Sequence, residues 1–348
     1  MTRVNRNLLI TVGILLVLSV LTYRQTVTRT ERFQRGQVFL QNLNTDEIAK
    51  IHLLQGETEI TLQRQGDGFT VVERQGYPVS NESVNRLLRT VVEIGLEREI
   101  GSGETLAEEL EIEPMTAETT EVSLWDGADK EMVRVRLGKS FDEGPGRYIQ
   151  RLDGEVSPIY LSSGGVSVST DVGSYLQKEI LNRDQSEVVR LKGADFELEK
   201  VDGETTLSLA GEAASVKLKT SQVNRIQGVV SGLKYEEVYL SDDPEVGDLQ
   251  FEPALRVDLE DGSGYELSYA SRDDRGFLRV EGFHSVSQVA ISRDESEEQL
   301  AEKAEVLTRA DEIEAFNKFH GSWTYELGDW IAESLRFRRH DLIDNESS

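Results

Sequence analysis

The sequence predicts an α+β protein of two tandem homologous domains, each a mainly antiparallel sheet with one packed long helix, after a single N-terminal transmembrane helix. Three observations lead to this fold class. The short phrase Leu110–Pro114 (LEIEP) recurs as Leu249–Pro253 (LQFEP), together with its neighbours. Alternation of apolar and polar residues is interrupted in each half by helical spacing. An uncharged apolar run lies close to the N-terminus.

The apolar run is the first element, Asn7–Tyr23. As a helix it would span roughly 25 Å, the short end of what crosses a hydrocarbon core. No small-x-small cleavage site and no cysteine follow it, which disfavours a cleaved signal peptide and a lipoprotein. We expect residues 1–36 to form a membrane anchor and a polar stalk. The residues expected in the bilayer are Leu8, Leu9, Ile10, Val12, Ile14, Leu15, Leu16, Val17, Leu18, Val20 and Leu21.

Arginines on both sides of this run bear on its orientation. Two precede the run and four follow it, so charge counting alone mildly opposes a cytoplasmic N-terminus. The four downstream arginines are spread out, however, and long acidic domains cross membranes regardless of such charges. We therefore expect a single-pass protein of the cytoplasmic membrane with its body on the extracytoplasmic side. The arginines are Arg3, Arg6, Arg24, Arg29, Arg32 and Arg35.

The recurring phrase belongs to a longer repeat. Before it, VNRLLR at Val84 matches VNRIQG at Val223, with the same spacing of 139 residues as the two phrases. After it, VSLWDG at Val122 matches VDLEDG at Val257. Matches in one order along both halves indicate an internal duplication of two sibling domains. We expect the first repeat at 37–183 and the second at 184–348.

The first repeat begins with strands and then a helix. Residues 49–74 alternate between apolar and polar side chains, as antiparallel strands with one wet face do. Residues 81–94 switch to helical spacing after a capping serine. The apolar face of this predicted helix consists of Val84, Leu87, Leu88, Val91 and Ile94.

The rest of the first repeat returns to strands. The LEIEP phrase is expected to connect helix to sheet, because Pro114 blocks a helix there. Residues 119–138 read as a hairpin with its turn at Asp126–Asp129, and 146–162 as a second hairpin. Residues 171–182 are expected to close the repeat as a short helix.

The second repeat follows the same order with one addition. Its long helix is expected at 221–233, and an extra helix near 295–319. Two interpretations of the extra helix remain open, a partner-docking element or a surface helix on its own sheet. For docking, the candidate residues are Leu300, Leu307 and Phe316.

Charge and composition exclude several classes of protein. The chain has 64 acidic and 38 basic residues, for a net charge of −26. Six of the basic residues are the arginines that flank the predicted anchor, so the rest of the chain is more acidic still. So acidic a body repels phosphate backbones, and nucleic-acid binding is not expected. No cysteine is present, which excludes disulfides, thiolate nucleophiles and cysteine-ligated metals.

Motifs that carry chemistry are not found in the sequence. The four histidines, His52, His284, His320 and His340, show no metal-ligand spacing. The acidic stretch 241–248 lacks the spacing of a calcium loop. We therefore expect no catalytic, metal or cofactor-binding residues and no cofactor. Three aromatic residues could be interface anchors, but at helical spacing they are expected in the core; they are Tyr175, Trp323 and Trp330.

The pattern resembles the family called domain of unknown function 4340. The resemblance rests on the anchor followed by strands, the stretch Gly66–Ile94, the L-x-x-x-P phrase before a hairpin, and the closing aromatics Tyr175 and Trp330. Phe69 stands where that family usually has tryptophan. The resemblance implies a membrane-anchored bacterial protein, often encoded beside ABC transporters of the gliding-motility type.

Two functions are then expected as alternatives. The first is a non-catalytic, extracytoplasmic accessory or scaffold of an ABC-type transporter, whose partners are the permease and ATPase subunits and the lipid bilayer. The second is an envelope glycan-binding or hydrolytic protein that uses paired carboxylates. A cavity with two facing acids would favour the second.

Overall fold

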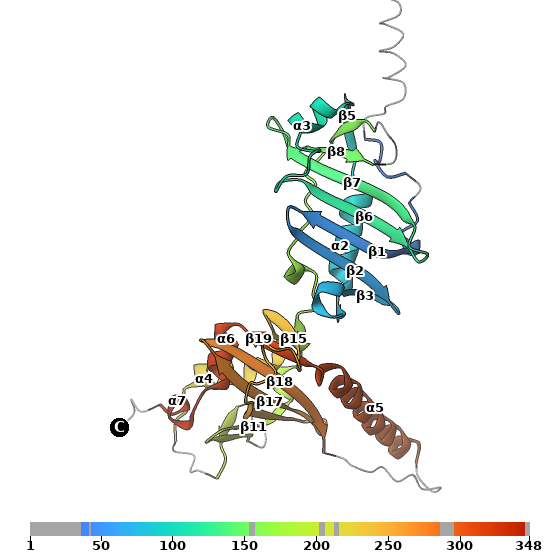
Figure 1. Cartoon of the computed structure of the whole chain (residues 1–348). Coiled ribbons are helices and arrows are strands. Elements are labelled where there is room, and N and C mark those ends of the chain that lie inside the picture. The colour runs from blue at the N-terminus through green and yellow to red at the C-terminus, as the bar shows by residue number, and fades with distance from the viewer. Residues whose placement is uncertain are drawn as a thin grey trace, which may run out of the picture. The chain divides into compact units, whose positions relative to one another are not determined.

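Figure 1 shows the chain as a computed structural model, which describes residues 36–41, 43–152, 157–201, 206–211, 216–285 and 296–344. The chain divides into two compact units, of which unit 1 ends at Leu176 and unit 2 begins at Gln177. The predicted anchor residues between Leu8 and Leu21 lie outside the described residues. Across the described ranges, we find no helix with the length and apolar character that a bilayer crossing requires.

Unit 1 is built on a nine-stranded sheet with the order β4-β3-β2-β1-β6-β7-β8-β9-β5. All of its neighbouring strands pair antiparallel. The strands are β1 (Ile48–Gln55), β2 (Thr58–Gln65), β3 (Gly68–Val71), β4 (Tyr77–Pro78), β5 (Leu96–Gly101), β6 (Thr120–Asp126), β7 (Glu131–Ser140), β8 (Arg147–Arg151) and β9 (Ile159–Ser162). Both predicted hairpins, β6–β7 and β8–β9, are present.

One face of this sheet is covered by helix α2 (Asn81–Val92). The predicted helix is therefore confirmed to within two residues at its end. Val84, Leu87 and Val91 are buried against the sheet, but Leu88 is only half-buried. The expectation that Leu88 is a core residue was wrong, because it lies about 100° around the helix from Leu87, at the margin of the buried face.

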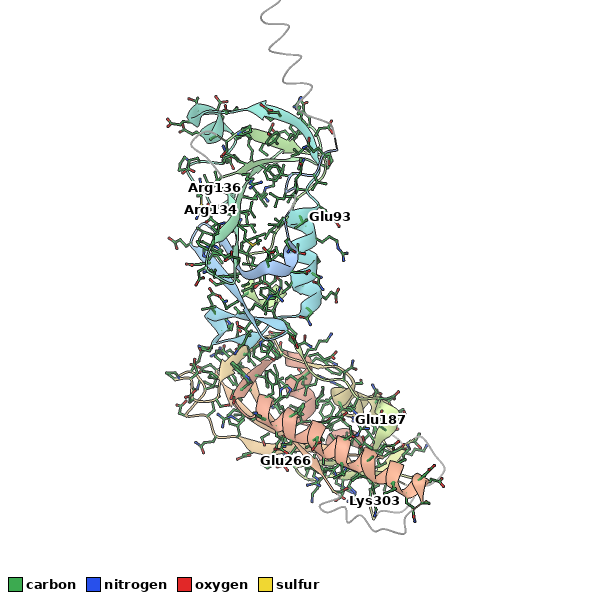
Figure 2. The ribbon with its side chains drawn as sticks, turned by 90° about the vertical axis from the view of Figure 1, so that its right-hand side faces the viewer. Glu93, Arg134, Arg136, Glu187, Glu266 and Lys303 are labelled. Carbon is green, nitrogen blue, oxygen red and sulfur yellow. The ribbon has the colours of Figure 1, made fainter. Side chains whose placement is uncertain are left out.

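The other face of the sheet carries an ion-pair network. Figure 2 shows Arg134 and Arg136 of β7 on the side away from α2 and from Glu93, the residue that follows the helix. Arg136 Nε donates to Glu121 of β6 at 2.7 Å. Burial raises the pKa of Glu121, although the positive charge of Arg134 opposes that rise. The network lets alternate polar residues of the central strands be buried on this face.

A second, smaller core lies at the β8–β9 end of unit 1. A short helix that the sequence did not predict, α3 (Glu104–Glu109), leads into the LEIEP phrase. Leu110 and Ile112 of the phrase pack with Ala107 and Ile159. The phrase thus covers a patch of sheet before the chain enters β6. In unit 2 the matching phrase enters β16 (Glu252–Leu259) directly, with Pro253 already in the strand.

The predicted closing helix at 171–182 is not formed. A 3-10 turn at Val172–Ser174 is followed by the short strand β10 (Glu179–Leu181), which pairs with β14 (Leu233–Lys234) in a two-stranded sheet. The backbone N–H and C=O groups of β10 form hydrogen bonds with β14. A short isolated helix that contains a glycine would be less stable than this pairing.

Unit 2 is built on an eight-stranded sheet with the order β13-β12-β11-β16-β17-β18-β19-β15. Apart from β4, unit 1 has the same order of corresponding strands. Both first strands also share an irregularity, between Ile48 and Lys50 in β1 and between Val188 and Arg190 in β11. The strands not yet given are β11 (Val188–Gly193), β12 (Glu197–Lys200), β13 (Leu207–Leu209), β15 (Glu237–Leu240), β17 (Ser263–Arg272), β18 (Arg275–His284) and β19 (Trp323–Leu327).

The long helix of unit 2 is shorter than predicted. Helix α4 (Thr220–Gln227) continues as a 3-10 turn over Gly228–Ser231. Val223, Ile226 and Val230 are buried, as the helical spacing predicted. Two short helices, α6 (Asp329–Leu335) and α7 (Arg339–Leu342), follow β19. The α+β class with mainly antiparallel pairing is therefore confirmed in both units.

The extra helix of unit 2 is α5 (Glu297–His320), close to the predicted range. Ser296 caps it and forms a capping box with Gln299, which explains why the helix begins here. Its C-terminal half packs on the sheet, where Ile313 is buried and lies so close to Gly282 that a Cβ there would be 3.1 Å from the Ile313 side chain. In the N-terminal half, residues 297–301 are all exposed.

Candidate functional site

The three predicted docking residues lie on two different sides of α5. Leu300 is 40% exposed and Leu307 is 45% exposed. Phe316 is half-buried, and its ring packs on Tyr265 of β17 with centroids 5.2 Å apart. Phe316 therefore helps to hold α5 on its own sheet. The surface-helix interpretation therefore accounts for Phe316, and Leu300 and Leu307 stay candidates for docking.

Leu300 and Leu307 form a stripe with Ala304, which is also exposed. These positions are four and three residues apart, so they share one side of the helix. That side is turned well away from Ile313, which faces the sheet. We call Leu300, Ala304 and Leu307 the α5 stripe.

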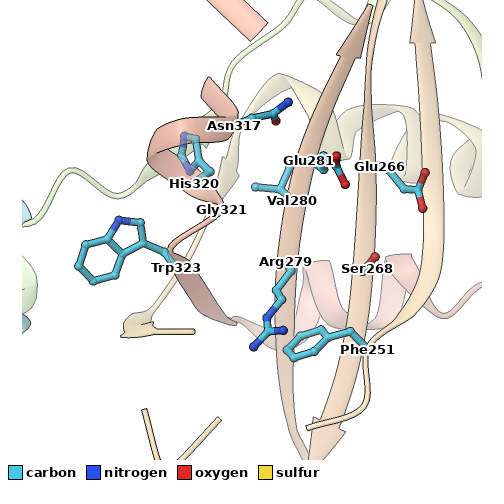
Figure 3. Close-up of a pocket in the computed structure, with 10 residues that line it drawn as sticks. All are labelled: Phe251, Glu266, Ser268, Arg279, Val280, Glu281, Asn317, His320, Gly321 and Trp323. Carbon is cyan, nitrogen blue, oxygen red and sulfur yellow. The ribbon is translucent and has the colours of Figure 1, made fainter. Parts of the chain in front are cut away.

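A cavity of about 340 Å³ lies where β18 and β19 separate. The two strands pair from Gly276 to Leu278 of β18, and β19 then diverges toward the end of α5. Figure 3 shows the side chains around the opening, with Trp323 and His320 on one side and Glu266 and Glu281 on the other. The sequence did not predict this cavity, because the point where two strands part leaves no periodic signal.

On the α5 side of the cavity, the side-chain amide of Asn317 bonds the edge of β18 where β19 no longer pairs with it. The Asn317 side chain donates to the Gly282 carbonyl at 2.7 Å and accepts from the Gly282 N–H at 2.6 Å. These two bonds are the same ones that a neighbouring strand would make. They lock the end of α5 to the edge of β18.

Two carboxylates face the cavity from adjacent strands. Glu266 of β17 lies directly opposite Glu281 of β18, and in the described part of the chain neither forms an ion pair. The nearby guanidinium of Arg279 is already engaged: it donates to Thr324 Oγ1 at 3.0 Å and to the Ser241 carbonyl at 2.9 Å, and it stacks on the ring of Phe251. Burial lowers the pKa of Arg279.

His320 forms the floor of the cavity on the helix side. It is buried, its Nδ1 lies 2.7 Å from the Tyr325 hydroxyl, and its ring packs on Phe316. Burial lowers the pKa of His320 to about 4. The imidazole is therefore neutral at pH 7, and it has an architectural role that lone histidines often have in cores.

The acidic loop 241–248 is held by arginines. Arg272 donates to the Glu245 carbonyl at 2.7 Å and pairs with Asp248, and Arg275 pairs with the Glu245 carboxylate at 2.8 Å. Val246 of the loop is itself buried. Nowhere in the described ranges do three histidine or acidic side chains converge as a metal site would require.

Of the three aromatic residues expected in the core, two are buried and one is exposed. Tyr175 and Trp323 are buried, and the Tyr175 hydroxyl donates to the Ser169 carbonyl at 2.6 Å. Burial raises the pKa of Tyr175 to about 12. Trp330 is 52% exposed, so its expected burial was wrong. It lies on the outer side of α6, where the Arg225 guanidinium is 5.2 Å from its ring centroid.

Comparison of the sequence with models of known protein families finds one match. The model of the family described as domain of unknown function (DUF4340) matches residues 70–253, more than half of the chain. The chain belongs to the DUF4340 family. The family resemblance drawn from the sequence is thereby confirmed. No curated protein and no solved structure matches the chain.

The DUF4340 match runs from β3 in unit 1 to the start of β16 in unit 2. It includes α2, α4 and both copies of the L-x-x-x-P phrase. Helix α5 and most of the cavity lie after its last residue, Pro253. The family match therefore describes the scaffold, and the two candidate sites are features of this chain beyond it.

Proposed function

We propose that this DUF4340 protein is a non-catalytic accessory or scaffold of an ABC-type transporter, anchored in the cytoplasmic membrane with its body on the extracytoplasmic side. The anchor is the apolar run that contains Leu8 to Leu21. The partners are the permease and ATPase subunits, of which the permease is the one accessible from outside. The observation that carries this proposal is the exposed α5 stripe.

The stripe supports docking because nothing within unit 2 needs it. Leu300 and Leu307 lie on the side of α5 away from the sheet, so they contribute little to folding of the unit. Burial of a leucine side chain stabilises a complex by about 1.5–3 kcal/mol. An apolar stripe with this spacing is the usual anchor of a helix that binds in a groove.

The charge of α5 indicates what kind of groove it fits. Between Glu297 and His320 the sequence has seven acidic residues and three lysines or arginines. Acidic residues flank the stripe, so the complementary surface is an apolar groove with basic margins. A permease segment near the outer headgroups, with apolar and basic residues, has that chemistry.

We also propose that the two units are homologous products of a duplication, as tandem domains after the anchor. Their corresponding strands lie in the same order, and their first strands share the same irregularity. A duplicated scaffold with one added helix explains why α5 is the element in which the units differ most.

Replacing both leucines of the stripe is expected to release the transporter. Glutamine keeps helix propensity, so Leu300→Gln/Leu307→Gln should leave α5 folded while it removes the apolar contacts. Tagged protein purified from detergent-solubilised membranes should co-purify permease and ATPase subunits, and the variant should recover less than about a tenth as much.

The matched control is Val72→Gln in unit 1, where a somewhat more exposed apolar side chain (53% exposed) is lost outside α5. It should recover the subunits as the unaltered protein does. Recovery of no transporter subunit by intact protein would overturn the proposal. Equal recovery by the stripe variant would overturn the assignment of the site to α5.

A second candidate function is favoured by one observation, the Glu266–Glu281 pair in the cavity beside two aromatic rings. Paired carboxylates are the chemical requirement for glycoside hydrolysis, and aromatic rings bind sugar faces. If the protein acts in this way, it should release reducing ends from chito-oligosaccharides or cell-wall glycan. Glu266→Gln and Glu281→Gln should each abolish that release, whereas Glu57→Gln, on an exposed turn of unit 1, should not.

A further inference from the structure

Unit 2 carries a group of basic side chains without acidic partners. Elsewhere in this acidic chain, exposed arginines form ion pairs, as Arg190 does with Glu199 at 2.7 Å. Residues 216–225 and 329–344 together hold six lysines or arginines and four acidic residues, in a molecule of net charge −26. Among the described residues of these two segments, four exposed basic side chains form no ion pair, namely Lys217, Lys219, Arg336 and Arg338.

The fold brings these four side chains onto neighbouring segments. The N–H of Lys219, just before α4, donates to the Leu342 carbonyl of α7 at 2.8 Å, and the Lys217 carbonyl accepts from the Asp344 N–H at 2.9 Å. Helix α4 also contacts α6, and Figure 1 shows α4, α6 and α7 on one side of unit 2. The two arginines lie in the short connection between α6 and α7.

An exposed tryptophan lies beside these charges. Trp330 of α6 is 52% exposed. Arg225 of α4 donates to the Trp330 carbonyl at 2.8 Å and to the Ser334 hydroxyl at 2.9 Å, and its guanidinium lies 5.2 Å from the indole centroid. The same guanidinium is 5.3 Å from the ring centroid of Phe337. The indole is therefore held in place while much of the residue remains exposed.

Packing within unit 2 does not account for Trp330. The closing aromatic residue of unit 1, Tyr175, is 4% exposed, so the same position in the sibling unit faces its core. A tryptophan that is held rigid at the surface is a typical anchor of a protein interface, and arginine is enriched beside it. We call Trp330 and its neighbours the α6–α7 patch, which consists of Trp330, Phe337, Lys217, Lys219, Arg336 and Arg338.

The charge of the α6–α7 patch indicates the kind of surface that it fits. Basic side chains without acidic partners are complementary to an anionic surface, and the acids nearest to them are engaged: Glu333 accepts from Arg225 at 2.8 Å and Asp341 accepts from the Arg338 N–H at 2.9 Å. A bilayer or a nucleic acid is much larger than the patch, so it would also meet the many acids of a chain of net charge −26. A short acidic protein segment would contact the patch alone.

We propose that the α6–α7 patch binds an acidic segment of a partner protein, whose carboxylates lie on the unpaired basic side chains and whose apolar side chain packs on the Trp330 ring. The inference goes beyond the proposed function, because it requires neither the α5 stripe nor a transporter. Each proposal can therefore fail without the other.

The test is calorimetric titration of the full-length protein in neutral detergent micelles. The probe is the blocked peptide Ac-Glu-Glu-Leu-Glu-Glu-Leu-Glu-Glu-NH₂. Three further versions replace every glutamate by glutamine, every glutamate by lysine, or both leucines by serine. We expect the acidic peptide to bind with a dissociation constant about tenfold lower than that of the glutamine version, and the lysine version not to bind. The serine version should bind more weakly than the leucine version, because it has no apolar side chain for Trp330.

Variants at exposed positions separate the charge from the apolar contact. Arg336→Gln/Arg338→Gln should weaken binding of the acidic peptide by about fivefold. Trp330→Gln should weaken binding of the leucine peptide and leave that of the serine version unchanged. The matched control removes two exposed arginines from unit 1, Arg89→Gln/Arg98→Gln, and should bind like the unaltered protein. The α5 stripe variant should also bind like the unaltered protein, so a failure of transporter docking leaves this result intact.

Three outcomes would overturn the proposal. Equal binding of the glutamate and glutamine peptides, or no binding of either, would show that the patch does not select acidic segments. Equal weakening by the patch variant and the unit 1 control would show that binding does not occur at the patch. Loss of the peptide when phosphatidylglycerol is added to the micelles would assign the patch to anionic lipid, whereas we expect the peptide to stay bound.

Discussion

Leu87→Ala is expected to destabilise unit 1 by about 2–5 kcal/mol, whereas Leu88→Ala, one residue away, should cost clearly less. Leu87 is 5% exposed between α2 and the sheet, and its truncation leaves a cavity that the rigid strands cannot close. Leu88 is half-buried, so water replaces part of its side chain at lower cost. The pair is matched in residue type, helix and helix propensity.

The measurement is urea unfolding of the full-length protein in mild detergent. Trp125 is the only tryptophan of unit 1, so its fluorescence in a Trp323→Phe/Trp330→Phe background follows that unit alone. This separation is needed because two units need not unfold together. Equal costs for the two substitutions would contradict the orientation of α2 described above.

Acidification is expected to destabilise unit 2 through His320. The histidine is buried, and burial lowers its pKa from 6.5 to about 4. The unfolded chain therefore binds a proton between these values when the folded chain does not. The stabilisation is fully present above pH 6.5 and is lost as the pH falls through 4, by about 3 kcal/mol in total.

His320→Asn is the informative variant, since its amide can keep a polar contact with the Tyr325 hydroxyl without titrating. Its free energy of unfolding should depend less on pH between 6.5 and 4 than that of the unaltered protein. Fluorescence of Trp323 and Trp330 in a Trp125→Phe background reports unit 2. His340→Asn, at an exposed histidine, serves as the control and should leave the slope unchanged.

Asp261 acts in a different range of pH and does not obscure this result. Its partial burial opposes ionisation, but hydrogen bonds from Ser263 and Arg183 lower its pKa from 3.8 to about 2. The stability that it contributes is present above pH 3.8 and is lost as the pH falls through 2. A loss of stability between pH 6.5 and 4 therefore does not come from this carboxylate.

Much of the fold could be predicted because periodicity reports burial on one face. The strands of 49–74, both hairpins of unit 1, α2 and α5 all follow from repeated apolar spacing. Element ends and short elements escaped prediction because tertiary contacts decide them: α3 is held by the packing of Leu110, and β10 by pairing with a strand distant in sequence.

The candidate sites were predictable only in part. Leu300 and Leu307 lie at helical spacing, which the sequence displays, but the same spacing could not separate them from Phe316, which packs on Tyr265. The Glu266–Glu281 pair depends on the register of two strands. The register depends on the hydrophobic pattern of the whole sheet. The residues next to any one of the 64 acidic side chains therefore do not reveal which residue lies opposite it.

The arginine-held loop 241–248 has a consequence for ionic strength. The Arg275–Glu245 ion pair is substantially exposed, with side chains 37% and 46% accessible, so dissolved salt screens it strongly. The bond from Arg279 to the Ser241 carbonyl involves no acidic partner and persists under the same conditions. Rising salt therefore loosens the end of the loop that Arg275 holds, while the end beside the cavity stays fixed, so the loop responds to a saline environment at one end only.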